Sequence, residues 1–282
     1  MYQKKVWLTG SNGRLGQTIQ RFLNPYEIEI LATDKDQVDI TNSFATNQFV
    51  DRNRPEIIIN CSSVSNRKFC EENPIEAFRV NGIGARNVAI ASNRGRAKLV
   101  QLSTEEVFDG KSFESYKEYD KVNPVTVYGK SKEMGEEFVK SFARKYFIIR
   151  TSRMYSLENK FVESIIEEAK NTGKVVVPKN QFTNPTSAIE LAKFILRLIE
   201  TSEYGLYHAS CKGVCSRKEF AQKVLELSQI KADVVEVEDK ENIEFRQVHL
   251  ALKNFILDIT GVYEFSTWQS ALEEYINKII KK

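Results

Sequence analysis

Cysteine, proline and histidine are scarce in this chain of 282 residues, which contains four, six and two of them. Cys211 and Cys215 lack a second closely spaced pair of ligands, so we expect no zinc or other metal site. We interpret His208, which lies in a strand-like run, as a packed structural residue, and His249 has no recognisable partner in the sequence. Cys61 follows an apolar run and is predicted to be a buried thiol. These scarcities argue against a metal centre and against a catalytic histidine.

A large charge excess and long hydrophobic runs are absent as well. Lys and Arg number 41 against 38 Asp and Glu, a net charge of +3, which is too small and too scattered to predict a nucleic-acid partner. No secretory hydrophobic region and no apolar run of membrane length is present, so we expect a cytoplasmic protein with no membrane partner. Hydrophobic residues at 41% and charged residues at 28% are typical of soluble globular proteins.

Apolar runs and helical patterns alternate through the first half of the chain. Strands are predicted at 6–9, 28–32, 56–60, 98–103 and 146–150, and helices at 15–22, 44–53, 74–94 and 128–143. In the last of these helices the apolar spacing is carried by Met134, Phe138 and Phe142. This alternation is typical of the α/β class, with a doubly wound parallel Rossmann sheet.

The pattern loosens after about residue 153, and no Gly/Ser linker or internal repeat appears. We therefore predict an NAD(P)-binding Rossmann domain over 1–153 and a smaller α/β lobe, mainly for substrate binding, over 154–282. This prediction allows some segments of 154–282 to form part of the Rossmann sheet.

A glycine-rich loop, Thr9–Gly16, joins the first predicted strand to the first predicted helix. Gly10 allows a tight turn, Gly13 allows the backbone to approach a pyrophosphate, and Gly16 allows the helix to pack near the sheet. Asp34 lies 18 residues beyond Gly16 at the end of the second strand, where its carboxylate can accept hydrogen bonds from an adenosine ribose. This context predicts a dinucleotide cofactor, NADH or NADPH.

The choice between the two cofactors stays open. Asp34 favours the free 2′-hydroxyl of NAD, whereas Lys35 and Arg14 are near enough in sequence to receive the 2′-phosphate of NADP. Either basic residue could equally be a solvated surface charge.

Tyr128 and Lys132 are four residues apart and share one face of a predicted helix. A free tyrosine, whose pKa is near 10, is a poor acid at neutral pH, and a nearby ammonium is expected to lower that pKa. Ser103 and Thr104 end the fourth strand, where either hydroxyl could bind the same carbonyl oxygen as the tyrosine. The pattern is typical of hydride-transfer enzymes that protonate a carbonyl.

Longer segments carry a resemblance to a known family. They are Thr9–Gly16, Asp39–Thr41, Arg54–Asn60, Asn81–Val88, Ser103–Thr104, Val107–Gly110, Tyr128–Lys132, Arg150–Ser152, Asn184–Thr186 and Tyr207–Ser210. Through them the chain resembles the extended short-chain dehydrogenase/reductases, and within these the dTDP-4-dehydrorhamnose reductase family.

The resemblance implies reduction of the 4-keto group of a nucleotide-linked 6-deoxy sugar by NADPH or NADH. Matching positions imply Thr104, Tyr128 and Lys132 as the catalytic residues. The expected cofactor-binding residues are Gly10, Asn12, Gly13, Arg14, Leu15, Asp34, Lys35, Asp39, Ile40, Cys61, Ser62, Ser63, Tyr128 and Lys132. The expected substrate-binding residues are Ser65, Thr104, Glu105, Tyr128 and Arg153.

The chain departs from the family pattern where the sugar is expected. Glu105 and Glu106 stand in a segment that usually reads STDYVFDG, and Arg153 replaces a tryptophan of an RTSW segment. Residues 61–65 replace an AAYT-like segment, and 244–249 replace a late arginine–proline motif. We therefore hypothesise a different keto sugar nucleotide and a more charged pocket, including an Arg153–carboxylate pair. The alternative is that Glu106 points to solvent and Arg153 caps the strand.

Two other functions are compatible with the same scaffold. One is a sugar-nucleotide epimerase or dehydratase, and the other is a non-catalytic NAD(P)-binding regulatory subunit. The expected partner of the enzyme is its nucleotide-sugar substrate, and a homodimer is an assembly that we leave open.

Overall fold

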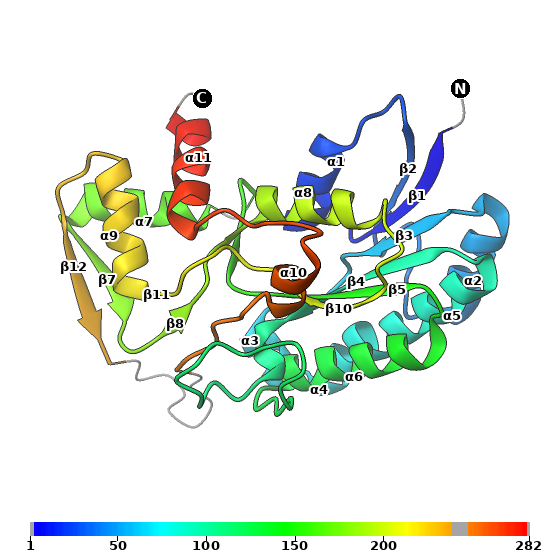
Figure 1. The fold of residues 1–282 in the computed structure, drawn as a ribbon. Coiled ribbons are helices and arrows are strands. Elements are labelled where there is room, and N and C mark those ends of the chain that lie inside the picture. Colours follow the sequence, from blue (N-terminus) through cyan, green and yellow to red (C-terminus); the bar gives the residue numbers. More distant parts are fainter. Residues whose placement is uncertain (1–2, 159, 239–247, 281–282) are drawn as a thin grey trace.

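The structure is a computed structural model that describes residues 3–158, 160–238 and 248–280. Its centre is a six-stranded sheet in the order β10-β5-β4-β3-β1-β2, with every neighbouring pair parallel (Figure 1). The strands are β1 (Lys4–Thr9), β2 (Ile28–Thr33), β3 (Ile57–Asn60), β4 (Lys98–Thr104), β5 (Tyr146–Thr151) and β10 (Gly205–His208). The strand order reverses between β1 and β3, and ligands of such sheets bind beyond the carboxyl ends of the strands at that point.

Helices cover both faces of the sheet. In Figure 1, α1 (Arg14–Phe22) and α8 (Ala188–Leu198) lie above it, and α2 (Ser43–Asn53), α5 (Ala85–Gly95) and α6 (Val127–Phe142) lie below. Side chains of β1 alternate between the two cores, with Val6 and Leu8 in one and Trp7 in the other. The sheet is therefore buried on both sides, and the Rossmann prediction is confirmed.

The helix predicted at 74–94 is divided into α4 (Pro74–Phe78), a π-helical segment (Arg79–Gly84) and α5. Asn81 lies in the π-helical segment and links two other parts of the chain. Its side-chain amide donates to the carbonyl of Val64 and to the hydroxyl of Ser131, both at 2.9 Å. These bonds hold the chain after β3 against α6. π-Helical bulges of this kind are frequent near functional sites.

The second half forms a smaller lobe beside one end of the sheet. Its elements are β6 (Met154–Tyr155), α7 (Phe161–Thr172), β7 (Lys174–Pro178), β8 (Phe182–Thr183), β9 (Thr186–Ser187), β11 (Cys215–Ser216), α9 (Arg217–Leu227), β12 (Asp233–Val237), α10 (Phe255–Thr260) and α11 (Trp268–Ile280). The strand β10 also comes from this half but pairs with β5 in the central sheet. The boundary at residue 153 stays a prediction.

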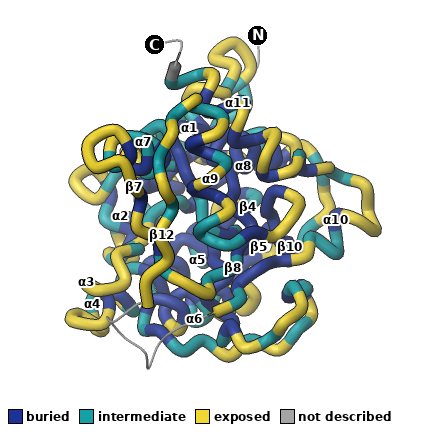
Figure 2. The backbone as a smooth tube through the Cα atoms, turned by 90° about the vertical axis from the view of Figure 1, so that its left-hand side faces the viewer, coloured by how far each residue is buried: buried dark blue, intermediate teal, exposed yellow. Residues whose placement is uncertain are grey.

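Burial follows this arrangement. Strands β4 and β5 are almost wholly buried, whereas β12 lies at the surface (Figure 2). Across the described ranges, no helix combines the length and apolarity that a membrane crossing requires.

Candidate active site

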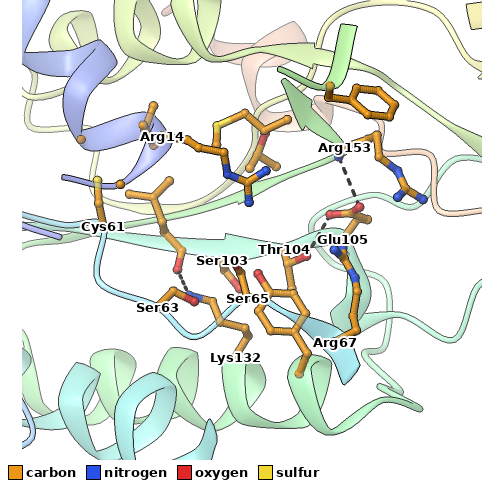
Figure 3. A pocket seen from close by; sticks show the side chains of 18 of the residues that line it. Arg14, Cys61, Ser63, Ser65, Arg67, Ser103, Thr104, Glu105, Lys132 and Arg153 are labelled. Atoms are coloured by element: carbon orange, nitrogen blue, oxygen red, sulfur yellow. Dashed lines mark hydrogen bonds between the residues drawn. The ribbon is translucent and has the colours of Figure 1, made fainter. Parts of the chain in front are cut away.

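A cavity of about 320 Å³ opens at the carboxyl ends of the central strands (Figure 3). The start of α1, the chain after β3, the end of β4 and the first turns of α6 all contribute to its wall. Of the residues predicted from sequence, the wall contains Gly13, Arg14, Leu15, Cys61, Ser63, Ser65, Thr104, Glu105, Tyr128, Lys132 and Arg153. Residues predicted for the cofactor and for the substrate therefore meet in one cavity.

The glycine loop is shaped by close contacts, which are severe at Gly10 and Gly16 and less so at Gly13. A Cβ on Gly10, whose φ is +64°, would lie 2.7 Å from the backbone nitrogen of Ser62, and one on Gly16 would lie 2.8 Å from Cα of Ser11. A Cβ on Gly13 would meet only the Gly10 carbonyl, at 3.1 Å, and Gly13 lines the cavity.

The start of α1 is suited to an anion. The helix begins at Arg14 and no side chain caps its N-terminus, so the dipole and the free N–H groups of its first turn are available to a pyrophosphate. Together with the cavity that Gly13 lines, this donor set fits a dinucleotide.

Gly13→Val should therefore remove cofactor affinity without unfolding the loop. Gly13 has φ −71° and ψ 167°, which valine adopts readily, while its side chain would occupy the space facing α1. We expect NADPH to bind at least about tenfold more weakly, a loss of about 1.4 kcal/mol or more, in a fluorescence titration. Gly16→Val is the comparison, because it should lower the melting temperature of the cofactor-free protein. Wild-type affinity in Gly13→Val would place the pyrophosphate elsewhere.

The adenosine end of the predicted site lies outside the cavity wall. Asp34 is positioned beside the loop, where its carboxylate accepts a hydrogen bond from the backbone nitrogen of Asn12 at 2.7 Å. Lys35 is exposed and lies 3.9 Å from Glu76, and Ile40 is buried against Gly84. The predicted residues that do not line the cavity are Gly10, Asn12, Asp34, Lys35, Asp39, Ile40 and Ser62. Their roles stay predictions.

The proposed catalytic residues come from α6 and β4. Thr126 caps α6 by accepting a hydrogen bond from the backbone nitrogen of Gly129 at 2.9 Å, which starts the helix just before Tyr128. One turn later, Nζ of Lys132 donates to the carbonyl of Leu102 at 2.6 Å. Thr104, at the end of β4, donates its hydroxyl hydrogen to Glu105 at 2.9 Å. Lys132, Ser103 and Thr104 lie near the middle of the cavity in Figure 3.

The electrostatics of Tyr128 differ from the prediction. Burial raises the pKa of Tyr128 to about 12, and the cation that most opposes this rise is Arg67, 5.4 Å from the ring centroid. Burial also lowers the pKa of Lys132 to about 8, against the opposing charge of Glu136. The expectation that Lys132 lowers the pKa of Tyr128 is wrong for this arrangement, because the lysine ammonium is itself desolvated and bound to a strand carbonyl.

The two glutamates after β4 both point inward. Glu105 and Glu106 are 3% and 4% exposed, so the alternative that Glu106 faces solvent is wrong. Glu106 forms an ion pair with Arg67, whose Nε lies 2.6 Å from Oε1. Burial, and then the charge of Glu106, raises the pKa of Glu105. The second carboxylate, Glu106, therefore holds the Arg67 guanidinium at the site.

Arg153 lines the cavity rather than capping β5. Its backbone nitrogen donates to Glu105 at 3.3 Å, and its φ of 35° is unusual for a residue with a side chain. Cys61, predicted to be buried, is only half-buried and also faces the cavity. Of the replaced late motif, residues 244–247 lie outside the described residues.

The wall also contains Ser103, which the sequence offered beside Thr104 for the carbonyl oxygen, and Gly16 of the glycine loop. Further wall residues were not predicted for the site from the sequence. They are Arg67, Leu102, Thr151, Met154, Phe161 and Arg217. Arg67 follows Ser65 in the chain after β3, so its position could have been suspected. Arg217 begins α9 in the second lobe, and no local pattern indicates that it reaches the site.

One known protein family matches almost the whole of this chain. The model of the family described as the RmlD substrate binding domain matches residues 4–280. The chain belongs to this family.

Relatives of this family cover nearly the whole chain. A dTDP-4-dehydrorhamnose reductase structure from Bacillus anthracis str. Ames, in complex with NADP, is 38% identical with a TM-score of 0.94 and covers 98% of this chain and 100% of its own. The spore coat polysaccharide biosynthesis protein SpsK of Bacillus subtilis (strain 168) is 32% identical over 97% of each chain. The dTDP-4-dehydrorhamnose reductase of Aggregatibacter actinomycetemcomitans is 30% identical over 95% of this chain and 97% of its own.

These findings confirm the predicted resemblance. They also confirm an NAD(P)-dependent oxidoreductase of the short-chain dehydrogenase/reductase type. Neither an epimerase or dehydratase nor a non-catalytic subunit is favoured by them.

Proposed function

We propose that the protein reduces the 4-keto group of a nucleotide-linked 6-deoxy sugar, with Thr104, Tyr128 and Lys132 as its catalytic residues. The observation that carries this proposal is their shared cavity with the open start of α1. When bound, NADPH or NADH supplies the hydride to the carbonyl carbon. The residues of this chain orient the carbonyl and handle its proton.

Tyr128 is the proton donor in this scheme. With a pKa of about 12 its hydroxyl keeps its proton at neutral pH, which is the form that an acid in the reductive direction requires. Proton transfer to the developing alkoxide leaves a phenolate. The positive charge of Arg67, which lies beside the ring, stabilises the phenolate. Arg67 belongs to the part of the cavity wall where we expect the substrate.

Thr104 and Lys132 position the reacting groups. The Thr104 hydroxyl lies at the end of β4, where it can turn from Glu105 to the carbonyl oxygen of the sugar. Lys132 is 3% exposed and anchored to Leu102, so its position is well defined before any ligand binds. We assign its remaining N–H groups to the nicotinamide ribose.

The test is a panel of nucleotide-linked 4-keto sugars, with the absorbance of the reduced cofactor followed for NADH and NADPH in parallel. We expect oxidation of the cofactor with at least one 4-keto-6-deoxy sugar nucleotide and none with the corresponding 4-hydroxy sugar. A tightly retained oxidised cofactor together with epimerised product would instead identify an epimerase. Binding of the cofactor with no turnover of any sugar would identify a regulatory subunit.

The ionisation of Lys132 should make kcat/KM for reduction decrease at alkaline pH. Below about pH 8 the lysine carries its positive charge, and above that pH the charge is lost, because the pKa of Lys132 is about 8. Since kcat/KM reports the ionisations of the free enzyme, kcat/KM for reduction should fall above about pH 8. In Lys132→Arg the fall near pH 8 should be absent, because the usual pKa of arginine is several units higher than this. The same decrease in kcat/KM in that variant would mean that another group ionises.

Two further expectations are part of this proposal. The four cysteines are all free thiols, which supports a reducing, cytoplasmic setting. A homodimer is testable by sedimentation at several protein concentrations. A single species with the mass of one chain at every concentration would exclude it.

A further inference from the structure

Three arginines gather at the substrate end of the cavity. Arg67 comes from α3 (Arg67–Glu72), Arg153 from the chain after β5, and Arg217 from the start of α9. In Figure 3, Arg67 and Arg153 lie on either side of Glu105 beyond Thr104, while Cys61 and the start of α1 lie at the opposite end. Arg67 and Arg153 are therefore separate from the start of α1, where the cofactor pyrophosphate is expected.

The two nearby carboxylates satisfy only part of this positive charge. Glu106 is bound to Arg67, and Glu105 accepts the Thr104 hydroxyl and the backbone nitrogen, not the guanidinium, of Arg153. Within the described residues, neither Arg153 nor Arg217 forms an ion pair with a carboxylate.

Arg153 has unused hydrogen-bonding capacity. Its Nε is buried and has no hydrogen-bond partner among the described residues, although a buried charged donor left unpaired is costly. Among the residues that the structure describes, the Arg217 side chain donates only to a neutral acceptor, the Gln181 amide oxygen at 3.3 Å. Its guanidinium lies 5.6 Å from the Phe161 ring centroid.

The arginines also repel one another. The pKa of Arg217 is lowered to about 9, first by burial and then by the charges of Arg153 and Arg67. Burial and the charge of Arg67 lower the pKa of Arg153 as well. Such an arrangement becomes favourable when an anion lies between the guanidinium groups, which match the oxygens of phosphate and carboxylate.

We infer that Arg153 and Arg217, with Arg67 at their edge, form an anion-binding subsite for a phosphate or carboxylate group of the substrate. The inference rests on the proposed function in taking the substrate to be a sugar nucleotide. Two sources can supply the anion, the diphosphate that links nucleotide to sugar or a carboxylate carried by the sugar itself. In both cases this subsite selects the substrate by charge, next to the group that delivers the proton.

The test measures ligand affinity of the protein saturated with NADP⁺, by calorimetry with dTDP, dTDP-glucose and dTDP-glucuronate. Arg153→Met and Arg217→Met remove each charge with little loss of apolar contact. We expect at least a tenfold rise in Kd for an anionic ligand in each variant, with partial recovery in Arg153→Lys and Arg217→Lys. The Kd of NADP⁺ should change less than twofold.

Lys218→Met is the matched control. It removes one positive charge from the residue next to Arg217, but Lys218 is 41% exposed and pairs with Glu236 at the surface. Its ligand affinities should equal those of the wild type. Thermal melts of all variants identify any that fail to fold.

The ligand series separates the two sources. Weaker binding of all three ligands in both arginine variants assigns the subsite to the diphosphate. Unchanged dTDP affinity, with loss of a preference for dTDP-glucuronate over dTDP-glucose, assigns it to a sugar carboxylate. Wild-type affinity for all three ligands in both folded variants overturns the inference. Failure of the proposed reaction would look different, because the wild type would then bind these anions through the arginines yet turn over no keto sugar.

Discussion

Tyr128→Phe should lower kcat for reduction by about 10²–10⁴-fold, the usual contribution of a positioned acid. The substitution removes one oxygen and leaves the ring, which is 9% exposed and packs near Cys70 and Ala77. Arg67 keeps its contact with that ring. The cavity therefore keeps its shape and loses the group that gives the proton, so cofactor affinity should change less than twofold.

Single-turnover kinetics with a 4-keto sugar nucleotide would measure this effect, and a fluorescence titration would measure NADPH binding. Tyr119→Phe is the matched control, since Tyr119 is 64% exposed and lies away from the cavity wall. It should behave as the wild type. A loss of less than tenfold in Tyr128→Phe would mean that another group delivers the proton.

Of the variants that we propose, Arg150→Met should lose the most stability, about 3–5 kcal/mol in the free energy of unfolding. Arg150 and Glu136 are each 1% exposed and are joined by two hydrogen bonds, of 2.9 and 2.7 Å. Glu136 also accepts the hydroxyl of Ser103, and the Arg150 guanidinium lies 5.2 Å from the Phe108 ring centroid. Removing the arginine leaves a buried carboxylate one turn beyond Lys132 without its cation.

Urea denaturation of the single and double variants tests the cause. The double variant Glu136→Met/Arg150→Met should be more stable than Arg150→Met, because it leaves no uncompensated buried charge. Arg94→Met is the control, since its ion pair with Asp51 is exposed and should contribute no more than about 1 kcal/mol. Equal losses in Arg150→Met and Arg94→Met would show that burial does not govern this pair.

Local patterns were sufficient for the elements of the Rossmann half. The predicted strands there all exist, because runs such as Ile57–Asn60 fit a sheet buried on both faces and the glycines of Thr9–Gly16 permit one tight turn. The predicted helices exist as well, except that the one at 74–94 is interrupted by a π-helical segment. The buried face of α6 was harder to predict from the sequence. Phe142 is 40% exposed, whereas Gly135, Glu136 and Val139 are buried, because the helix turns its inner face towards Arg150 and the close contact at Asn81.

The sequence by itself determined the Tyr128–Lys132 spacing, the glycine loop and the family resemblance, since each depends on residues close together in the chain. Only the tertiary structure decided that Glu106 faces inward on Arg67, that burial raises the pKa of Tyr128, and that Arg217 reaches the same cavity from the second lobe. The reason is physical. Burial and the approach of distant charges set the ionisation of a side chain, and both arise only when segments far apart in the chain pack together.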